Sequence, residues 1–80
     1  MNQQQMEYAI EEMQKWIDRN ESEQSHLRTM LPIMTRMAIE CDDAETREKL
    51  MRWIGFMQGA LWEKDAFTVD DFRAMNTKEL

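Results

Sequence analysis

The chain has 80 residues, of which 42% are hydrophobic and 32% are charged, with two glycines and one proline. This composition is typical of one soluble helical domain, and it argues against a disordered chain and against a turn-rich β fold. The net charge of −6 argues against direct binding of nucleic acid and against attraction to anionic membranes.

The first half of the chain carries apolar residues three and four positions apart, the spacing of an amphipathic helix. A stripe that begins at Met6 and ends at Ile17 predicts a helix over residues 4–19. A second stripe, from Leu27 to Cys41, predicts a helix over residues 21–41. Asn20 is expected to cap that second helix, because it stands three residues before Glu23 in the spacing of a capping box.

The same half of the chain also fits one long helix. Apolar positions from 6 to 41 alternate four and three apart without a skip, and Asn20 and Gln24 would form a polar layer in a coiled coil bent near Pro32. Such a helix would be roughly 55 Å long and would need a second chain to cover it. The seven consecutive polar residues "RNESEQS" between the stripes favour the two-helix hairpin.

The third predicted helix, over residues 43–64, is apolar around most of its circumference. Asp42 or Asp43 is its expected cap. One stripe holds Leu50, Met51, Ile54, Met57 and Leu61, and a second holds Trp53, Phe56 and Ala60, with Trp62 as a further candidate. Gly55 and Gly59 each cost about 1 kcal/mol of helix stability, so the expected compensation is close packing of another backbone on them.

A short fourth helix is predicted over residues 68–76. Thr68 is its expected cap and Asp71 stands in the capping-box position, while Phe67 and Phe72 have the spacing of a hydrophobic staple. The predicted fold is therefore an all-α bundle of three main helices and a short fourth, in a single domain over residues 1–80. The second stripe of the third helix is more apolar surface than so short a chain can bury, so we expect a homodimer packed through that helix.

Candidate catalytic and metal-binding residues are sparse. Glu23 and His26 have the Glu-x-x-His spacing of di-iron bundles, but those sites need two such motifs and further glutamates. Glu45 and Glu48 form a Glu-x-x-Glu motif similar to one of the two acidic motifs of all-α nucleotide pyrophosphohydrolases, which bind Mg²⁺, and the second motif is missing. We therefore expect no catalytic residue, no metal site and no cofactor.

The lone cysteine, Cys41, excludes an intrachain disulfide and favours a reducing compartment. No apolar run approaches the roughly 18 residues that cross a bilayer, and the polar start "MNQQQ" differs from a signal peptide. The expected location is the cytoplasm, without a membrane partner.

The segments "RWIGFMQGALW" and "FTVDDFRAMN" resemble the ending of small accessory proteins encoded by tailed bacteriophages. The shared pattern, Gly-Phe-x-Gln-Gly-x-Leu-Trp followed by a Thr-x-Asp/Glu-Asp/Glu cap, covers about a third of the chain and concerns helix packing and capping. Its positions here are Gly55, Phe56, Gln58, Gly59, Leu61, Trp62, Thr68, Asp70 and Asp71. The resemblance implies a phage protein that modulates a bacterial protein, including anti-defence roles, and it implies no catalytic residue.

The predicted function is a non-enzymatic protein–protein interaction module that inhibits or adapts a bacterial target. Its expected self-association and partner residues are Trp53, Gly55, Phe56, Gln58, Gly59 and Trp62. An acidic cluster is expected to face a basic partner, and it consists of Glu40, Asp42, Asp43, Glu45 and Glu48. Two alternatives stay open: a small metal-dependent nucleotide hydrolase that uses Glu45 and Glu48, and an acidic mimic of nucleic acid.

Overall fold

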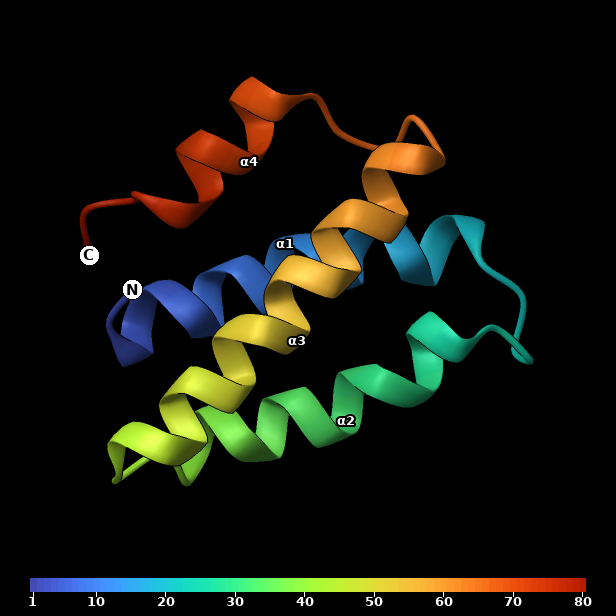
Figure 1. The fold of residues 1–80 in the computed structure, drawn as a ribbon. Coiled ribbons are helices and arrows are strands. Elements are labelled where there is room, and N and C mark those ends of the chain that lie inside the picture. The colour runs from blue at the N-terminus through green and yellow to red at the C-terminus, as the bar shows by residue number, and fades with distance from the viewer.

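The computed structural model describes residues 1–80 as four helices joined by short turns (Figure 1). The helices are α1 (Gln3–Asn20), α2 (His26–Ile39), α3 (Ala44–Glu63) and α4 (Val69–Asn76). They contain 75% of the residues and no strand is present, which confirms the all-α prediction. None of the four is both long enough and apolar enough to cross a bilayer.

α1 and α2 form an antiparallel hairpin, so the alternative of one long helix is wrong. Asn20 is the last residue of α1 and does not cap α2. The cap is Ser25, whose hydroxyl accepts a hydrogen bond from the Leu27 amide at 3.2 Å and donates one to Glu21 Oε1 at 2.9 Å. Because Ser25 supplies the cap, α2 begins at His26 and not at residue 21 as predicted.

The turn between α1 and α2 is held by the guanidinium group of Arg28. Its Nε donates to the Glu21 carbonyl at 3.1 Å, and its terminal nitrogen donates to the Asp18 carbonyl at 3.0 Å. These carbonyls belong to the end of α1, where no intrahelical donor remains for them. Further along, α2 runs through Pro32 without interruption, so the bend expected near this residue does not end the helix.

The predicted caps of the last two helices are confirmed. The Asp43 carboxylate accepts a hydrogen bond from the Thr46 amide at 2.6 Å at the start of α3. At the start of α4, Thr68 and Asp71 form a reciprocal capping box. The rings of Phe67 and Phe72 lie 5.5 Å apart, as the predicted hydrophobic staple requires.

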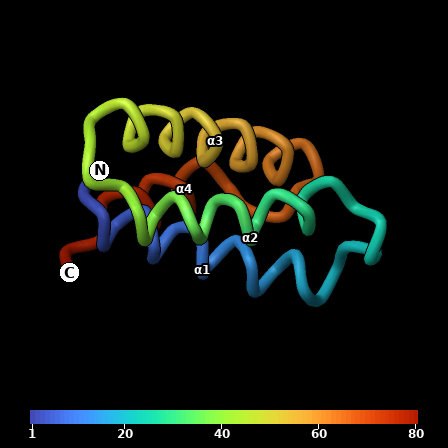
Figure 2. The backbone as a smooth tube through the Cα atoms, turned by 90° about the horizontal axis from the view of Figure 1, so that it is seen from below, coloured from blue at the N-terminus to red at the C-terminus, as the bar shows by residue number.

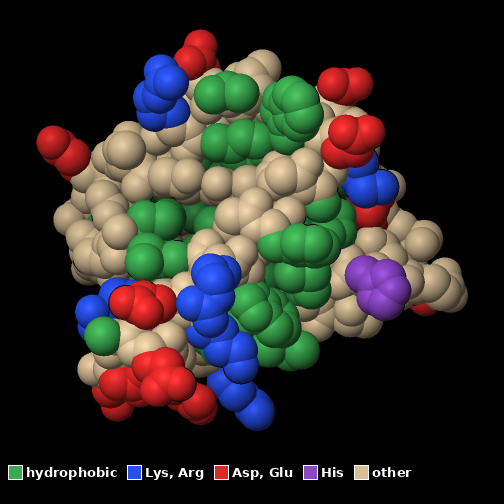
Figure 3. Space-filling view, in the orientation of Figure 1, with side chains coloured by type: hydrophobic (Ala, Val, Ile, Leu, Met, Phe, Trp, Pro, Cys, Tyr) green, Lys and Arg blue, Asp and Glu red, His purple; other side chains and the backbone are tan.

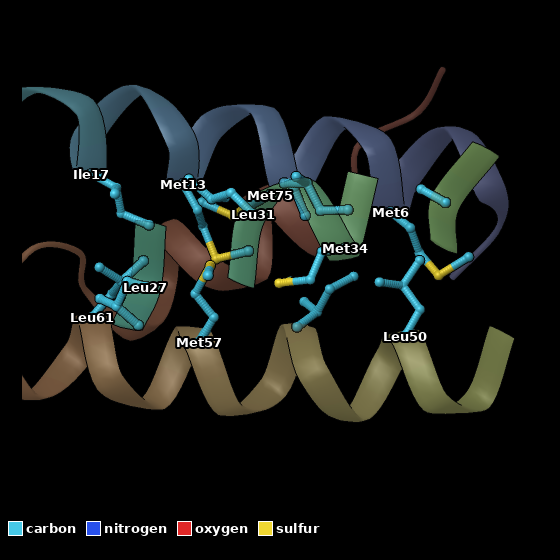
Figure 4. Packing of buried hydrophobic residues seen from close by; sticks show 14 of the residues in the cluster. Met6, Met13, Ile17, Leu27, Leu31, Met34, Leu50, Met57, Leu61 and Met75 are labelled. Carbon is cyan, nitrogen blue, oxygen red and sulfur yellow. The ribbon is translucent and has the colours of Figure 1, made fainter. Parts of the chain in front are cut away.

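The core lies where α1, α2 and α3 meet, and α4 closes it from the side of α1 (Figure 2). Sixteen residues are buried, none of them polar or charged apart from the thiol of Cys41. In Figure 4, Met6 and Met13 of α1 point toward Leu50 and Met57 of α3, with side chains of α2 and α4 between them. Five of the nine methionines are buried, which fits their use as fillers of irregular gaps.

Candidate interaction surface on helix α3

The helix α3 buries only one side. Leu50, Ile54, Met57 and Leu61 reach the core, and all four are nearly inaccessible to solvent. Met51 was predicted to share this stripe, but its side chain is 36% exposed. The reason is helical geometry, because Met51 lies about 100° around the helix from Leu50 and so stands at the edge of the buried side, with its Sδ 3.9 Å from the N-terminal ammonium group of Met1.

Two glycines lie on the outward side of α3, and the rest of the chain leaves them uncovered. Gly55 and Gly59 are both exposed, and a Cβ atom added at either position would have no neighbouring atom within 4 Å. The close packing that was expected to compensate for two helical glycines is therefore absent within this chain. A backbone of another molecule has room to approach there.

Two large apolar side chains flank these glycines. Phe56 is 66% exposed and Trp62 is 55% exposed, high values for side chains of this size. They were predicted on one stripe, but the six positions between them correspond to about 240° around a helix, so they lie on opposite flanks. We call the apolar and glycine part of the outward side of α3 the open face, and it consists of Met51, Gly55, Phe56, Gly59 and Trp62. Charged residues are also exposed on this side of the helix, including Glu48, Arg52 and Glu63.

The open face continues into a shallow groove between α3 and α2. This groove has a volume of about 440 Å³ and is lined by Met30, Arg52, Trp53 and Phe56. Trp53 is half-buried there, so its ring forms the wall of the groove and not a free surface. Figure 3 shows apolar side chains gathered along this border between the two helices. Met30 is partly buried, so it packs against the core and also lines the groove.

Gln58, another predicted partner residue, forms its hydrogen bonds within the chain. Its side-chain Nε2 donates to Asn76 Oδ1 at 2.6 Å, and Asn76 Nδ2 donates to Gln58 Oε1 at 3.0 Å. Both amide groups are thereby satisfied, and Gln58 is half-buried beside α4. The structure thus assigns Gln58 to the docking of α4 and leaves it outside the open face.

The acidic cluster lies at the corner between α2 and α3, where Figure 3 shows carboxylates crowded together. All five side chains are exposed, and none of them forms an ion pair. Asp43 differs from the others because hydrogen bonds from the backbone amide and then the hydroxyl of Thr46 hold the pKa of its carboxyl below the usual value. The corner therefore presents five carboxylates without an ion-pair partner, although the charge of Arg47 acts on Asp43.

The candidate metal-binding motifs have no further ligand side chains near them. No group of three or more His, Cys, Asp or Glu side chains is arranged to hold a metal ion, so neither Glu23 with His26 nor Glu45 with Glu48 forms part of a ligand set. The thiol of Cys41 is buried and donates to the Ala38 carbonyl at 3.1 Å, which is a structural contact.

No protein-family model matches this chain, and neither a curated protein nor a solved structure matches it.

Proposed function

We propose that this protein is a non-enzymatic interaction module whose open face on α3 first binds a second copy of the chain. The observation that carries the proposal is the combination of two uncovered helical glycines with Phe56 and Trp62 on either side of them. Exposing the apolar surface of an aromatic side chain to water is unfavourable in free energy, and aromatic side chains are enriched where proteins bind each other. The core is already filled, so these residues have no partner left within their own chain.

A two-fold, antiparallel pairing of α3 with α3 of a second copy would use every residue of the open face. If Gly55 faces Gly59 of the second copy, the two backbones can approach closely. Trp62 then reaches the level of Met51 of the second copy on one flank. On the other flank the two Phe56 side chains meet near the two-fold axis. Each contact is made twice or is symmetric, as a two-fold interface requires.

The first experiment is light scattering of the purified chain at micromolar concentration. We expect twice the chain mass of 9.7 kDa for the wild type, and a single chain for Phe56→Ser combined with Trp62→Ser. Ile39→Ser with Val69→Ser is the matched control, because it removes two equally exposed apolar side chains from other parts of the surface. A monomeric wild type would remove the self-association from the proposal.

The glycines allow a sharper test. Gly55→Ala and Gly59→Ala should each raise the stability of the single chain by about 1 kcal/mol, because alanine favours helix and nothing opposes the new methyl group. The same variants should weaken the dimer, since the methyl groups keep the two backbones apart. Gly55→Gln and Gly59→Gln should abolish it. Dimers that survive all four substitutions would show that the glycines are not in the interface.

The resemblance to tailed-phage accessory proteins supports a bacterial protein as the further partner, with inhibition or adaptation as the outcome in the host cytoplasm. Affinity capture from a bacterial lysate, with mass spectrometry of the bound proteins, would identify this target. The Phe56→Ser and Trp62→Ser variant is the reference sample. A protein captured equally by both forms does not bind through the open face.

The acidic cluster supports a second candidate role, in which it meets a basic partner or takes the place of nucleic acid in a basic cleft. The supporting observation is that five exposed carboxylates there have no ion-pair partner. Binding of this kind should weaken steeply with added salt. It should be lost when Asp42, Asp43 and Glu45 are replaced by amides, and it should survive Trp62→Ala. The opposite pattern would assign binding to the open face.

A further inference from the structure

A hollow that was not foreseen from the sequence lies on another side of the molecule, between α1 and α4. It has a volume of about 550 Å³. We call it the α1–α4 groove. Tyr8, Trp16 and Arg19 line it from α1, while Phe67, Ala74 and Lys78 line it from α4 and its flanking residues.

The floor of the groove is apolar and only partly covered. Trp16 and Phe67 are half-buried, so each offers part of its ring to a molecule in the groove. Ala74 is exposed and lines the groove, and its short side chain takes up little of the space there. Concave sites with an aromatic floor and a few polar groups at the rim are the usual form of ligand sites.

The rim of the groove carries two cations without a carboxylate partner. Arg19 and Lys78 form no ion pair, and the Lys78 ammonium lies 5.7 Å from the centre of the Tyr8 ring, where its charge is a minor cause of the lowered pKa of Glu12. The lining of the groove holds three basic and two acidic residues, whereas the whole chain has 10 basic and 16 acidic ones, so the groove is a more favourable place for an anionic ligand than the average surface.

The other charges of the groove are already engaged. Lys15 binds Glu12 at 2.9 Å, and the Tyr8 hydroxyl donates to the same carboxylate at 3.0 Å. The pKa of Glu12 is held below its usual value, chiefly by the hydrogen bond from Lys15, so this carboxylate stays ionised. Asp71 accepts a hydrogen bond from the Thr68 amide at 2.8 Å as part of the capping box.

We propose that the α1–α4 groove binds an acidic peptide segment of about five residues, with a carboxylate near each end and a bulky apolar side chain in the middle. Tyr8 and Arg19 are eleven residues apart on one helix, which corresponds to about 16 Å. An extended peptide covers that distance in about five residues. Lys78 beside Tyr8 and Arg19 at the far end would each bind a carboxylate, and the apolar side chain would lie on Trp16 and Phe67.

The spacing of the cations distinguishes this ligand from nucleotides. A mononucleotide concentrates its negative charge at one place, whereas Arg19 and Lys78 stand at opposite ends of the groove. A longer nucleic acid carries a negative charge on every nucleotide, so the carboxylates of Glu12 and Asp71 and the net charge of −6 would repel it more strongly than a peptide with two carboxylates. This proposal is independent of the open face, which lies on α3.

The test is a titration of the ¹⁵N-labelled full chain with acetyl-Glu-Ser-Phe-Ser-Glu-amide at millimolar concentration, followed by NMR. We expect the resonances of the Trp16 indole and of the Ala74 and Lys78 amides to shift together. Acetyl-Gln-Ser-Phe-Ser-Gln-amide should shift them at a several-fold higher concentration. Equal effects of the two peptides, or shifts confined to other residues, would overturn the proposal. A penta-uridine that binds these residues more tightly than the acidic peptide would also overturn it.

Variants locate the binding in the groove. Arg19→Gln and Lys78→Gln should each raise the Kd of the acidic peptide about threefold, the typical effect of one exposed ion pair. Ala74→Leu should block the middle of the groove and abolish the shift of the Trp16 indole. Arg36→Gln is the control, because it removes an exposed arginine from α2. If Arg36→Gln weakens binding as much as Arg19→Gln does, the attraction is general and the groove is not the site.

Discussion

The side-chain amides of Gln58 and Asn76 bind each other in both directions, with separations of 2.6 and 3.0 Å. Apart from a contact of Gln58 Nε2 with the Met75 sulfur at 3.8 Å, no other side-chain hydrogen bond or ion pair joins α3 to α4. The pair lies beside Met75, which with Phe72 is one of the two buried residues of α4. The short helix α4 is therefore positioned by a small apolar contact and one polar pair.

We expect Gln58→Ala and Asn76→Ala each to lower the free energy of unfolding by about 1 kcal/mol, because each leaves a half-buried amide without its partner. The double variant should cost about as much as either single variant, since the second substitution has no bond left to remove. Urea unfolding of the four proteins measures this coupling. Costs that simply add would show that the two amides do not act as a pair. Gln4→Ala, at an exposed position of α1, is the control.

The second prediction concerns the pH dependence of the α3 cap. The pKa of the Asp43 carboxyl is lowered by the hydrogen bonds from Thr46, so the folded chain binds this proton less readily than the unfolded chain does. The resulting stabilisation is present above the usual aspartate pKa of about 3.9, and it is lost as the pH falls through the lower folded value.

Asp43→Asn keeps an acceptor for the Thr46 amide and removes the titrating charge. We expect wild type to have the higher urea midpoint at neutral pH, and the difference from Asp43→Asn to vanish at about pH 2. Asp43→Ala should be less stable than Asp43→Asn throughout, because it removes the cap itself. A difference between wild type and Asp43→Asn that is constant with pH would contradict the assignment.

Local sequence signals predicted most of the fold. The spacing of apolar residues located the first three helices, and the cap and staple residues located α4. Asp43, Thr68 and the Phe67–Phe72 staple act as predicted because these signals involve residues close together in the chain. The error at the start of α2 arose because the local signal was ambiguous. Asn20 and Ser25 are both good caps, and only the path of the turn decides between them.

The candidate site was harder to predict than the helices. Gln58 was assigned to the partner surface because nothing in the sequence indicates that Asn76, eighteen positions away, would meet it. The α1–α4 groove was missed for the same reason, since it exists only where α4 docks against α1. By contrast, the uncovered glycines and the exposed aromatic residues of α3 follow from a simple excess of apolar residues on one helix.

The third prediction concerns the end of α3, where Asp65 has a φ angle of 57°. The Asp65 amide donates to the Trp62 carbonyl and the Ala66 amide donates to the Leu61 carbonyl, which is the Schellman pattern. Glycine adopts this left-handed conformation more readily than any other residue. Asp65→Gly should therefore raise the free energy of unfolding by about 1 kcal/mol, and Asp65→Val should lower it. Thermal unfolding of dilute samples measures both, and a loss of stability in Asp65→Gly would contradict the conformation.

The last prediction tests the direction of the proposed α3 pairing. Met51 and Trp62 are about 16 Å apart along one helix, too far for a disulfide within a chain. In the antiparallel pairing, residue 51 of one copy lies close to residue 62 of the other. In a Cys41→Ala background, Met51→Cys with Trp62→Cys should therefore yield a disulfide-linked dimer on mild oxidation, seen by non-reducing electrophoresis.

Each single-cysteine variant serves as the control for that experiment. In the antiparallel pairing the two copies of residue 51 are separated by about 18 Å along the helix axes, and the two copies of residue 62 by nearly as much, so neither single variant should cross-link. A parallel pairing would bring like residues together, and both single variants would then form dimers readily. If the single variants cross-link and the double variant forms no disulfide between residues 51 and 62, the pairing is parallel. The proposed orientation would then be wrong, and α3 would still be the interface.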